Sequence, residues 1–274
     1  MNDSATRRRL LTGWGILVLL FLYLPIAVVI AYSFNANEAV SNWTGFTLDW
    51  FTRAWETPRY QKALGLSLKI AVLNAIIATL LGTAAALALG RARSKWKVPF
   101  SVLVFLTLVV PEIVIAVASR IFFVKAHEGF SFFPSLGWKT ILMAHVVWSS
   151  AVVVLIVRSR FTGMGSSLEE ASFDLGAGPV KTFVQVTLPR LLPAIVAGAL
   201  LSFTMSFDNY VLSVFTASGD NETWPMAVFN DVRFGVTPAV NAISTVMFLV
   251  VAAGVAGAMW FVTRKSGEPA DGRG

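Results

Sequence analysis

The chain has 274 residues, of which 56% are hydrophobic and 14% charged, with no cysteine, two histidines and a formal net charge of +7. Soluble globular domains are about 45–50% apolar and about 25% charged, so this composition argues against a soluble enzyme, a disordered chain and a disulfide-rich secreted scaffold. The lack of cysteine excludes thiolate nucleophiles and sulfur-ligated metals, and two histidines argue against a histidine metal centre, so no metal site is expected. We therefore predict an integral membrane protein.

Six apolar stretches are long enough for membrane-crossing helices, which need about 20 apolar residues each. They cover residues 12–33, 63–90, 98–124, 139–158, 190–217 and 238–263. None alternates strictly between apolar and polar residues as a barrel strand does, so we predict an all-α integral membrane fold. The transmembrane domain then covers residues 12–263, between short tails at 1–11 and 264–274. Three arginines precede the first stretch, but its length and the lack of a small-residue cleavage site indicate an uncleaved anchor helix.

Basic residues set the predicted orientation, because Lys and Arg are enriched in cytoplasmic loops. With the N-terminus inside, 14 of the 22 basic residues fall in inner segments and six in outer loops. Both termini are therefore expected in the cytoplasm, and the positive charge reflects membrane topology rather than nucleic-acid binding. The outer segment 34–62 holds Trp43, Trp50 and Trp55, so we expect part of it to lie along the membrane surface.

The inner loop 159–189 is unusually long and carries its own helix signals. Ser167 and Glu170 have the spacing of a capping box, which predicts a two-turn helix over residues 168–175. Gly176 can end that helix in the left-handed conformation. The pattern predicts a helix followed by a sharp bend on the cytoplasmic face.

A second helix is expected after the bend. Pro179 suits its first position, and Pro189 is predicted to mark its end or a kink. Taken residue by residue, the loop could equally be an amphipathic linker on the membrane surface.

The spacing of this loop resembles the EAA loop of ABC importer permeases. The matching residues are Glu170-Ala171-Ser172, then Gly176, then Val186-Thr187-Leu188-Pro189, with Ser172 and Val186 as mild departures from the family pattern. The resemblance implies the type I ABC importer permease fold, in which this loop is a coupling helix that docks on a cytoplasmic ATPase. The residues assigned to ATPase coupling are Glu169, Glu170, Ala171, Asp174, Gly176, Leu188 and Pro189.

The same resemblance implies a set of partners in the bacterial inner membrane. They are a homologous second permease subunit, two cytoplasmic ATPase subunits and an extracytoplasmic substrate-binding protein. The chain has no G-x-x-x-x-G-K-[ST] stretch for phosphate binding. We therefore expect a non-catalytic subunit that binds no cofactor, with ATP and Mg²⁺ used by the partner ATPase.

Four ionisable residues lie inside the predicted spans, where such groups indicate function by default. Lys69 and Arg120 lie near outer ends and can extend toward water. Glu112 lies 14 residues beyond Val98, and Asp208 lies 14 residues beyond Ala194, in two spans that both run outward. Each carboxylate is therefore about 21 Å above that reference residue, which predicts that the two share one layer. The structural alternative is that Glu112–Arg120 or Asp208–Lys69 pairs only hold helices together.

Carboxylates interleaved with aromatic rings suit an organic polyammonium ion, through charge pairing and cation–π contact. The predicted substrate pathway comprises Glu112, Asp208, Asn209, Tyr210, Phe203, Phe207 and Trp148. His145, near Trp148, is expected to be a hydrogen-bonded helix residue rather than a ligand.

Longer stretches resemble the second permease subunit of spermidine/putrescine importers, which implies a polyamine substrate. They are residues 32–35, Pro111-Glu112, 202–209 and 228–242. Members often have two adjacent acids in the fifth span, whereas Asp208 is followed here by Asn209. Two alternatives stay open: the same permease for another organic cation, an amino acid or an anion, and a membrane scaffold that recruits a cytoplasmic partner.

Overall fold

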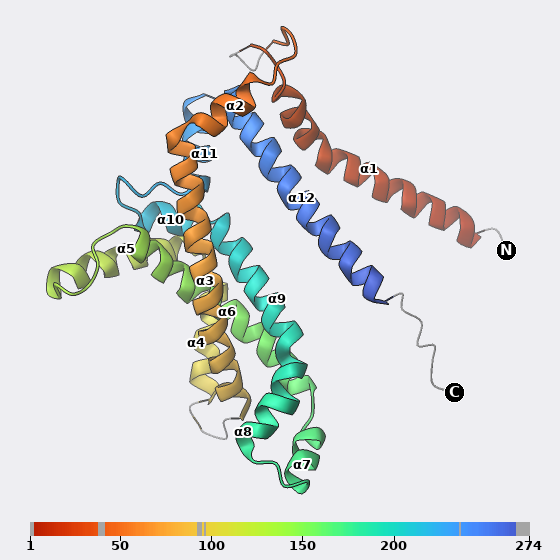
Figure 1. Cartoon of the computed structure of the whole chain (residues 1–274), viewed down its shortest axis with the longest axis vertical. Helices are drawn as coiled ribbons and strands as arrows, with labels where there is room; N and C mark the ends of the chain where they lie inside the picture. The colour runs from red at the N-terminus through yellow and green to blue at the C-terminus, as the bar shows by residue number, and fades with distance from the viewer. Residues whose placement is uncertain (1–2, 38–41, 92–94, 96, 236, 267–274) are drawn as a thin grey trace. The chain divides into compact units, whose positions relative to one another are not determined.

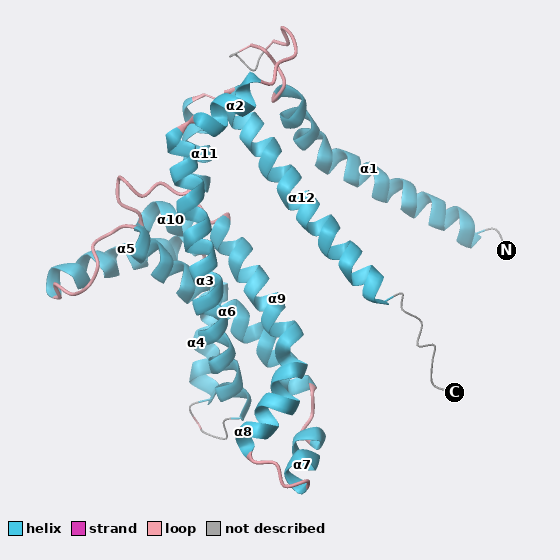
Figure 2. Cartoon of the chain, in the orientation of Figure 1, coloured by secondary structure: helices cyan, strands magenta, loops and turns pink. Residues whose placement is uncertain are grey.

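The computed structural model describes residues 3–37, 42–91, 95, 97–235 and 237–266. Within these residues, the regular structure is helical apart from one isolated antiparallel bridge between Asn35 and Phe46 (Figure 2). The helices are α1 Asp3–Tyr32, α2 Asp49–Glu56, α3 Pro58–Arg91, α4 Lys97–Val109, α5 Glu112–Gly129, α6 Trp138–Gly163, α7 Ser167–Asp174, α8 Pro179–Thr182, the π-helix η1 Phe183–Thr187, α9 Leu188–Phe207, α10 Val211–Thr216, α11 Trp224–Phe234 and α12 Pro238–Ser266.

The chain divides into two compact units, Met1–Tyr60 with Val228–Gly274, and Gln61–Ala227 (Figure 1). In the first unit, α12 contacts both α1 and α2. The indole N–H of Trp50 donates to the backbone carbonyl of Asn35 at 2.8 Å and fixes α2 on the preceding loop. Trp50 is buried while Trp43 and Trp55 are exposed, so the placement of this segment along a membrane surface stays a prediction.

The second unit is built around α6, which packs against α9, α10 and α4. Its core joins residues of α3, α6 and α9: Ala86, Leu89, Val153, Val154, Val157 and Leu191. Gly82 lets α3 approach α6 closely, since a Cβ there would lie 2.6 Å from the Cβ of Val153. This unit contains both regions that the sequence marks as functional.

The all-α membrane class is confirmed by long apolar helices. Four continuous helices have the length and apolarity of membrane spans: Leu10–Tyr32, Pro58–Arg91, Trp138–Gly163 and Pro179–Phe207. A fifth candidate is the bent pair α4 and α5, and Pro238–Val250 of α12 is a shorter apolar helix. The count of six spans therefore stays a prediction.

The stretch 98–124, predicted as one span, is not a single straight helix. The chain forms α4 and α5, which are bent by 108° relative to each other. Pro111 lies at the bend with extended backbone angles (φ −54°, ψ 134°). Because proline has no N–H and disfavours the helical conformation of the residue before it, the helix ends there and a new one begins at Glu112.

The stretch predicted as the span 190–217 overlaps a helix that begins before it and breaks inside it. The helix begins at Pro179 and continues through η1 and α9 to Phe207. Pro189 does not end it, because the wider π-helical turn of η1 comes just before the proline, which then lies in the first turn of α9 where its missing N–H is tolerated. The chain breaks instead at residues 208–210, before the short α10.

Candidate functional site

The segment between α6 and α9 contains the short helix α7, close to its predicted range. The capping box predicted from Ser167 and Glu170 is wrong: the N-cap is Ser166, and no side chain caps the helix. The amide of Glu170 donates to the carbonyl of Ser166 at 2.9 Å. Ser167 is already the first helical residue, so its hydroxyl is one position too far along to act as a cap.

Gly176 takes the left-handed conformation that the sequence predicts, with φ +81°. Its amide donates to Phe173 at 2.9 Å, and the amide of Ala177 donates to Ser172 at 3.0 Å, which together close the end of α7. Pro179 then begins α8 as predicted. The hydroxyls of Ser172 and Thr182 lie 2.9 Å apart and tie α7 to α8.

Two adjacent glutamates of α7 have different environments. One carboxylate oxygen of Glu169 accepts from the guanidinium of Arg91 at 3.1 Å and from the hydroxyl of Thr187. Arg91 ends α3, and its guanidinium carbon lies 5.6 Å from the ring centroid of Phe161 on α6. Glu169 therefore links α7 to α3 and to the start of the α9 helix, whereas Glu170 is exposed.

The loop exposes both apolar and acidic side chains. Ala171, Asp174 and Pro189 are exposed, and Leu188 is partly buried. Large apolar side chains are exposed along the same segment: Leu168, Phe173, Leu175, Val180 and Val184. Leu175 is 89% exposed and Val180 77%. A short segment that exposes several large apolar side chains is a candidate protein-binding surface.

A second candidate region lies where two helices are broken. Glu112 begins α5 after the bend at Pro111, and residues 208–210 separate α9 from α10. Helices α5 and α10 pack against each other. The side-chain amide of Asn209 donates to the Glu112 carboxylate, while its oxygen accepts from the amide of Leu212 at 2.9 Å. Asn209 thus joins the two breaks, and the structure brings Glu112 and Asn209 together as one layer predicts.

Asp208 is the exposed residue that follows α9, and it is the neighbour in sequence of Asn209, whose side chain meets Glu112. The ion pairs considered as a structural alternative are not formed among these described residues. Arg120 instead donates to the carbonyl of Phe215 at 2.9 Å, and the ammonium of Lys69 lies 3.7 Å from the ring centroid of Trp138. The two carboxylates therefore lie near each other without either of the expected cationic partners.

The aromatic residues predicted for the substrate pathway lie in different surroundings. Phe203 and Phe207 stack along α9 with ring centroids 6.0 Å apart. Trp148 is partly buried and packs against the cluster of α5, α6 and α10 side chains that includes Leu212. Tyr210 is partly buried at the break. Among the predicted pathway residues, Glu112 and Asn209 are hydrogen-bonded to each other, and Phe203 stacks on Phe207.

A buried polar network behind this layer was only partly expected. His145 is hydrogen-bonded as predicted: its Nδ1 lies 2.8 Å from the Ser206 hydroxyl and its Nε2 3.2 Å from that of Ser213. The amide of Asn74 donates to the Ser149 hydroxyl at 3.0 Å and to the Ser202 carbonyl at 2.8 Å. The sequence prediction missed Asn74, although a polar residue inside an apolar helix is itself a signal.

The long apolar helices define a class, the multi-pass membrane proteins, and the segment between α6 and α9 adds a loop of short helices to it. The family described as binding-protein-dependent transport system inner membrane component matches residues 78–264. The chain is 36% identical over 259 residues to the putrescine transport system permease protein PotI of Escherichia coli K12, covering 92% of each chain. It is 36% identical over 230 residues to the spermidine/putrescine permease protein PotC of Haemophilus influenzae, covering 84% of this chain and 87% of that protein.

Solved structures show the same fold at lower identity. A bacterial alginate ABC transporter, crystallised with an alginate-bound periplasmic protein, matches with a TM-score of 0.72 and 14% identity, covering 98% of both chains. The MetNI methionine ABC transporter matches with a TM-score of 0.62 and 17% identity, covering 78% of this chain and 97% of that one. The chain therefore belongs to the binding-protein-dependent permease family and is an inner-membrane permease subunit of an ABC importer.

Proposed function

We propose that this permease subunit carries polyamines of the putrescine and spermidine type into the cell. The observation that carries the proposal is the pair of carboxylates, Glu112 and Asp208, at two helix breaks that the bond between Asn209 and Glu112 joins. Neither forms the ion pair with Arg120 or Lys69 that a structural role predicts. Carboxylates near aromatic rings stabilise organic ammonium groups by charge pairing and cation–π contact. The relatives named for putrescine and spermidine transport support the same substrate class.

The cytoplasmic loop couples this pathway to a separate ATPase. Its exposed apolar residues and Glu170 form the surface that docks on that ATPase, while Gly176 holds the bend. The carboxylate of Glu169 accepts hydrogen bonds from Arg91 and Thr187. A movement of α7 is therefore transmitted to α3 and, through η1, to α9, which ends just before Asp208. ATP and Mg²⁺ are bound by the ATPase, and this chain contributes the mechanical link.

The assembly comprises this chain, a homologous second permease subunit, two cytoplasmic ATPase subunits and an extracytoplasmic substrate-binding protein. Both termini lie in the cytoplasm, in accordance with the positive-inside rule. The binding protein delivers the solute to the outer side, and ATP binding and hydrolysis reset the permease pair. The non-catalytic role of the chain follows from this division of labour.

The proposal is tested by ATP hydrolysis of the complete complex in lipid vesicles. The chain is purified with its co-produced partners, and the binding protein is added with putrescine, spermidine or a panel of non-amine solutes. Stimulation by a polyamine alone is the expected result. Stimulation only by another solute would keep the permease and overturn the polyamine assignment, and a complex without an ATPase would overturn the coupling role.

A second candidate, transport of another solute by the same permease, is favoured by Asn209. The residue next to Asp208 is an amide, and its side chain is engaged with Glu112 and Leu212. The layer therefore carries one formal charge fewer than a site with two adjacent acids. A less highly charged organic cation would suit this layer, and the same solute panel distinguishes it from spermidine.

A further inference from the structure

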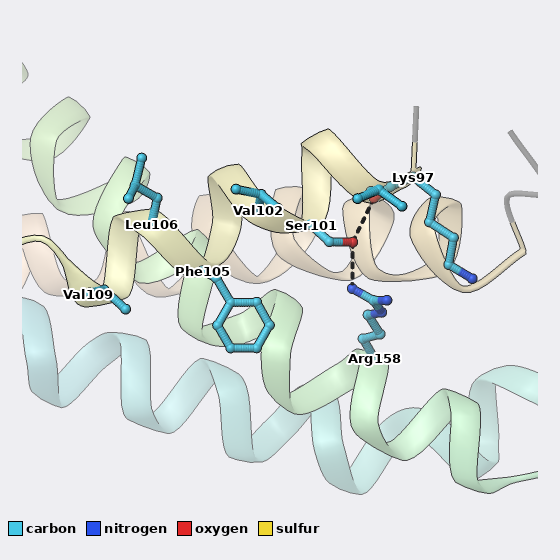
Figure 3. A pocket seen from close by; sticks show the side chains of 8 residues that line it. Lys97, Ser101, Val102, Phe105, Leu106, Val109 and Arg158 are labelled. Atoms are coloured by element: carbon cyan, nitrogen blue, oxygen red, sulfur yellow. Dashed lines mark hydrogen bonds between the residues drawn. The ribbon is translucent and has the colours of Figure 1, made fainter. Parts of the chain in front are cut away.

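A groove of about 480 Å³ runs along α4 beside α6 and is not part of the regions described above. Its apolar lining comes from one helix, through Val98, Val102, Phe105, Leu106 and Val109. Its polar lining is Lys97, Ser101 and Arg158. Figure 3 shows these polar residues gathered at one end of the groove, with Leu106 and Val109 toward the other.

The polar end is basic and held in place. The guanidinium of Arg158, on α6, donates to the Ser101 hydroxyl at 2.9 Å, and that hydroxyl donates to the Lys97 carbonyl at 2.7 Å (Figure 3). Arginine has five N–H donors in a planar fork, so this bond leaves others to meet an anion. Both basic residues are partly buried, and none of the residues that line the groove is acidic. The groove thus has two positive charges at one end of its apolar lining.

The helix that lines the groove is long enough to cross one leaflet of a bilayer. Helix α4 has 13 residues, which at about 1.5 Å each gives a length of about 20 Å. The hydrocarbon core of a bilayer is about 30 Å thick, so one leaflet contributes about 15 Å. An acyl chain lying along the groove would therefore have its headgroup level with Lys97 and its tail near the bend at Pro111.

We propose that this groove binds one anionic phospholipid. The phosphate lies against Arg158 and Lys97, and an acyl chain lies along Val102, Phe105 and Val109. Basic pockets between membrane helices recognise anionic headgroups in this way. A helix of another subunit would have to bring acidic side chains to both cations, whereas an anionic lipid carries its charge at the required end. The proposal does not depend on which solute the permease transports.

The test is lipid binding to the full-length chain, purified with its co-produced partners and followed by native mass spectrometry. Dioleoyl phosphatidylglycerol is titrated against dioleoyl phosphatidylcholine, which has the same acyl chains. We expect the anionic lipid to be preferred. Replacing Lys97 and Arg158 together by glutamine should lower that preference about 25-fold, since each basic residue contributes about fivefold. Arg158→Lys keeps the charge and should retain most of the preference.

Two further variants separate the groove from general surface charge. Lys181→Gln removes an exposed basic residue of α8 outside the groove and should leave the preference unchanged. Val102→Trp fills the apolar channel while keeping both charges, and should weaken binding of the anionic lipid. An unchanged preference in the double glutamine variant would overturn the proposal. A cysteine introduced at Val102, in a chain with no other cysteine, is labelled with a benzophenone maleimide and illuminated. A photo-cross-link to a second subunit would show that protein covers the groove instead.

Discussion

The loop that contains α7 and the layer at the helix breaks differ in two respects: how exposed their side chains are, and whether their polar groups have hydrogen-bond partners within the chain. On the loop, Glu170 is exposed, and Leu175 and Val180 are 89% and 77% exposed. In the layer, Asn209 bonds to both broken helices, and His145 behind it is buried with two hydroxyl partners. We propose that a partner protein covers the loop, whereas Asn209 and His145 find their hydrogen-bond partners within the chain. Changes in the loop should therefore disrupt coupling, and changes in the layer should affect selectivity and stability.

The largest effect is expected from Gly176→Val, which places a β-branched residue at the left-handed backbone position of the loop. A left-handed residue costs an L-amino acid about 1–2 kcal/mol, and more when it is β-branched. A Cβ at Gly176 would meet nothing within 4 Å, so the strain comes from the φ of +81° alone. We expect solute uptake by the complex in vesicles to fall more than roughly tenfold while membrane insertion persists.

Gly178→Ala is the matched control for that variant. Gly178 has φ −73°, which alanine adopts freely, and open space at its Cβ position. Uptake should stay near that of the original chain. Full uptake by Gly176→Val would contradict the coupling assignment of the bend.

The next largest effect is expected from removing the charges of the layer. Glu112→Gln and Asp208→Asn should each lower putrescine uptake about tenfold, since a hydrogen bond to a charged group contributes about 1.5–3 kcal/mol. Glu128→Gln, on the same helix α5 but exposed, should have no effect on the same radiolabelled uptake assay. Undiminished cation uptake in both layer variants would exclude the carboxylate site.

Asn209→Leu should destabilise the second unit by about 1–3 kcal/mol, because Glu112 and the amide of Leu212 each lose a partner. The measurement is thermal or denaturant unfolding in detergent, with uptake expected to fall several-fold. Thr204→Val serves as the comparison, since the exposed Thr204 bonds only to carbonyls of its own helix. Its effect should stay within about 0.5 kcal/mol. Equal stability of the two variants would show that the breaks do not depend on Asn209.

The smallest effect is expected at the link between α7 and α3. The Arg91–Glu169 pair is partly exposed, with side chains 53% and 20% accessible, so Glu169→Gln should cost no more than about 1 kcal/mol. We expect uptake to fall about twofold, and Arg91→Gln combined with it to add nothing, because both remove the same contact. Additive losses in the double variant would argue against a shared contact.

Glu170→Gln should instead weaken co-purification of the ATPase without changing stability.

Local signals predicted the backbone of the loop but not the directions of its side chains. Gly176 and Pro179 act through their own φ restrictions, so the bend and the start of α8 were predicted correctly. The inward turn of Glu169 depends on Arg91, 78 residues earlier in the chain. No spacing within the loop distinguishes it from Glu170.

By itself, the sequence determined the membrane class, the bend of the loop and the acidic candidates, because apolar length, fixed φ angles and the cost of charges in lipid are properties of short segments. Only the tertiary structure decided that Pro111 bends its span by 108°, that the helix continues past Pro189, and that Asn209 meets Glu112 across 97 residues of chain. Each of these outcomes depends on which helices pack together. A helix can continue through a proline when a widened π-helical turn accommodates it, or it can break there, according to which neighbouring groups bond the freed backbone atoms.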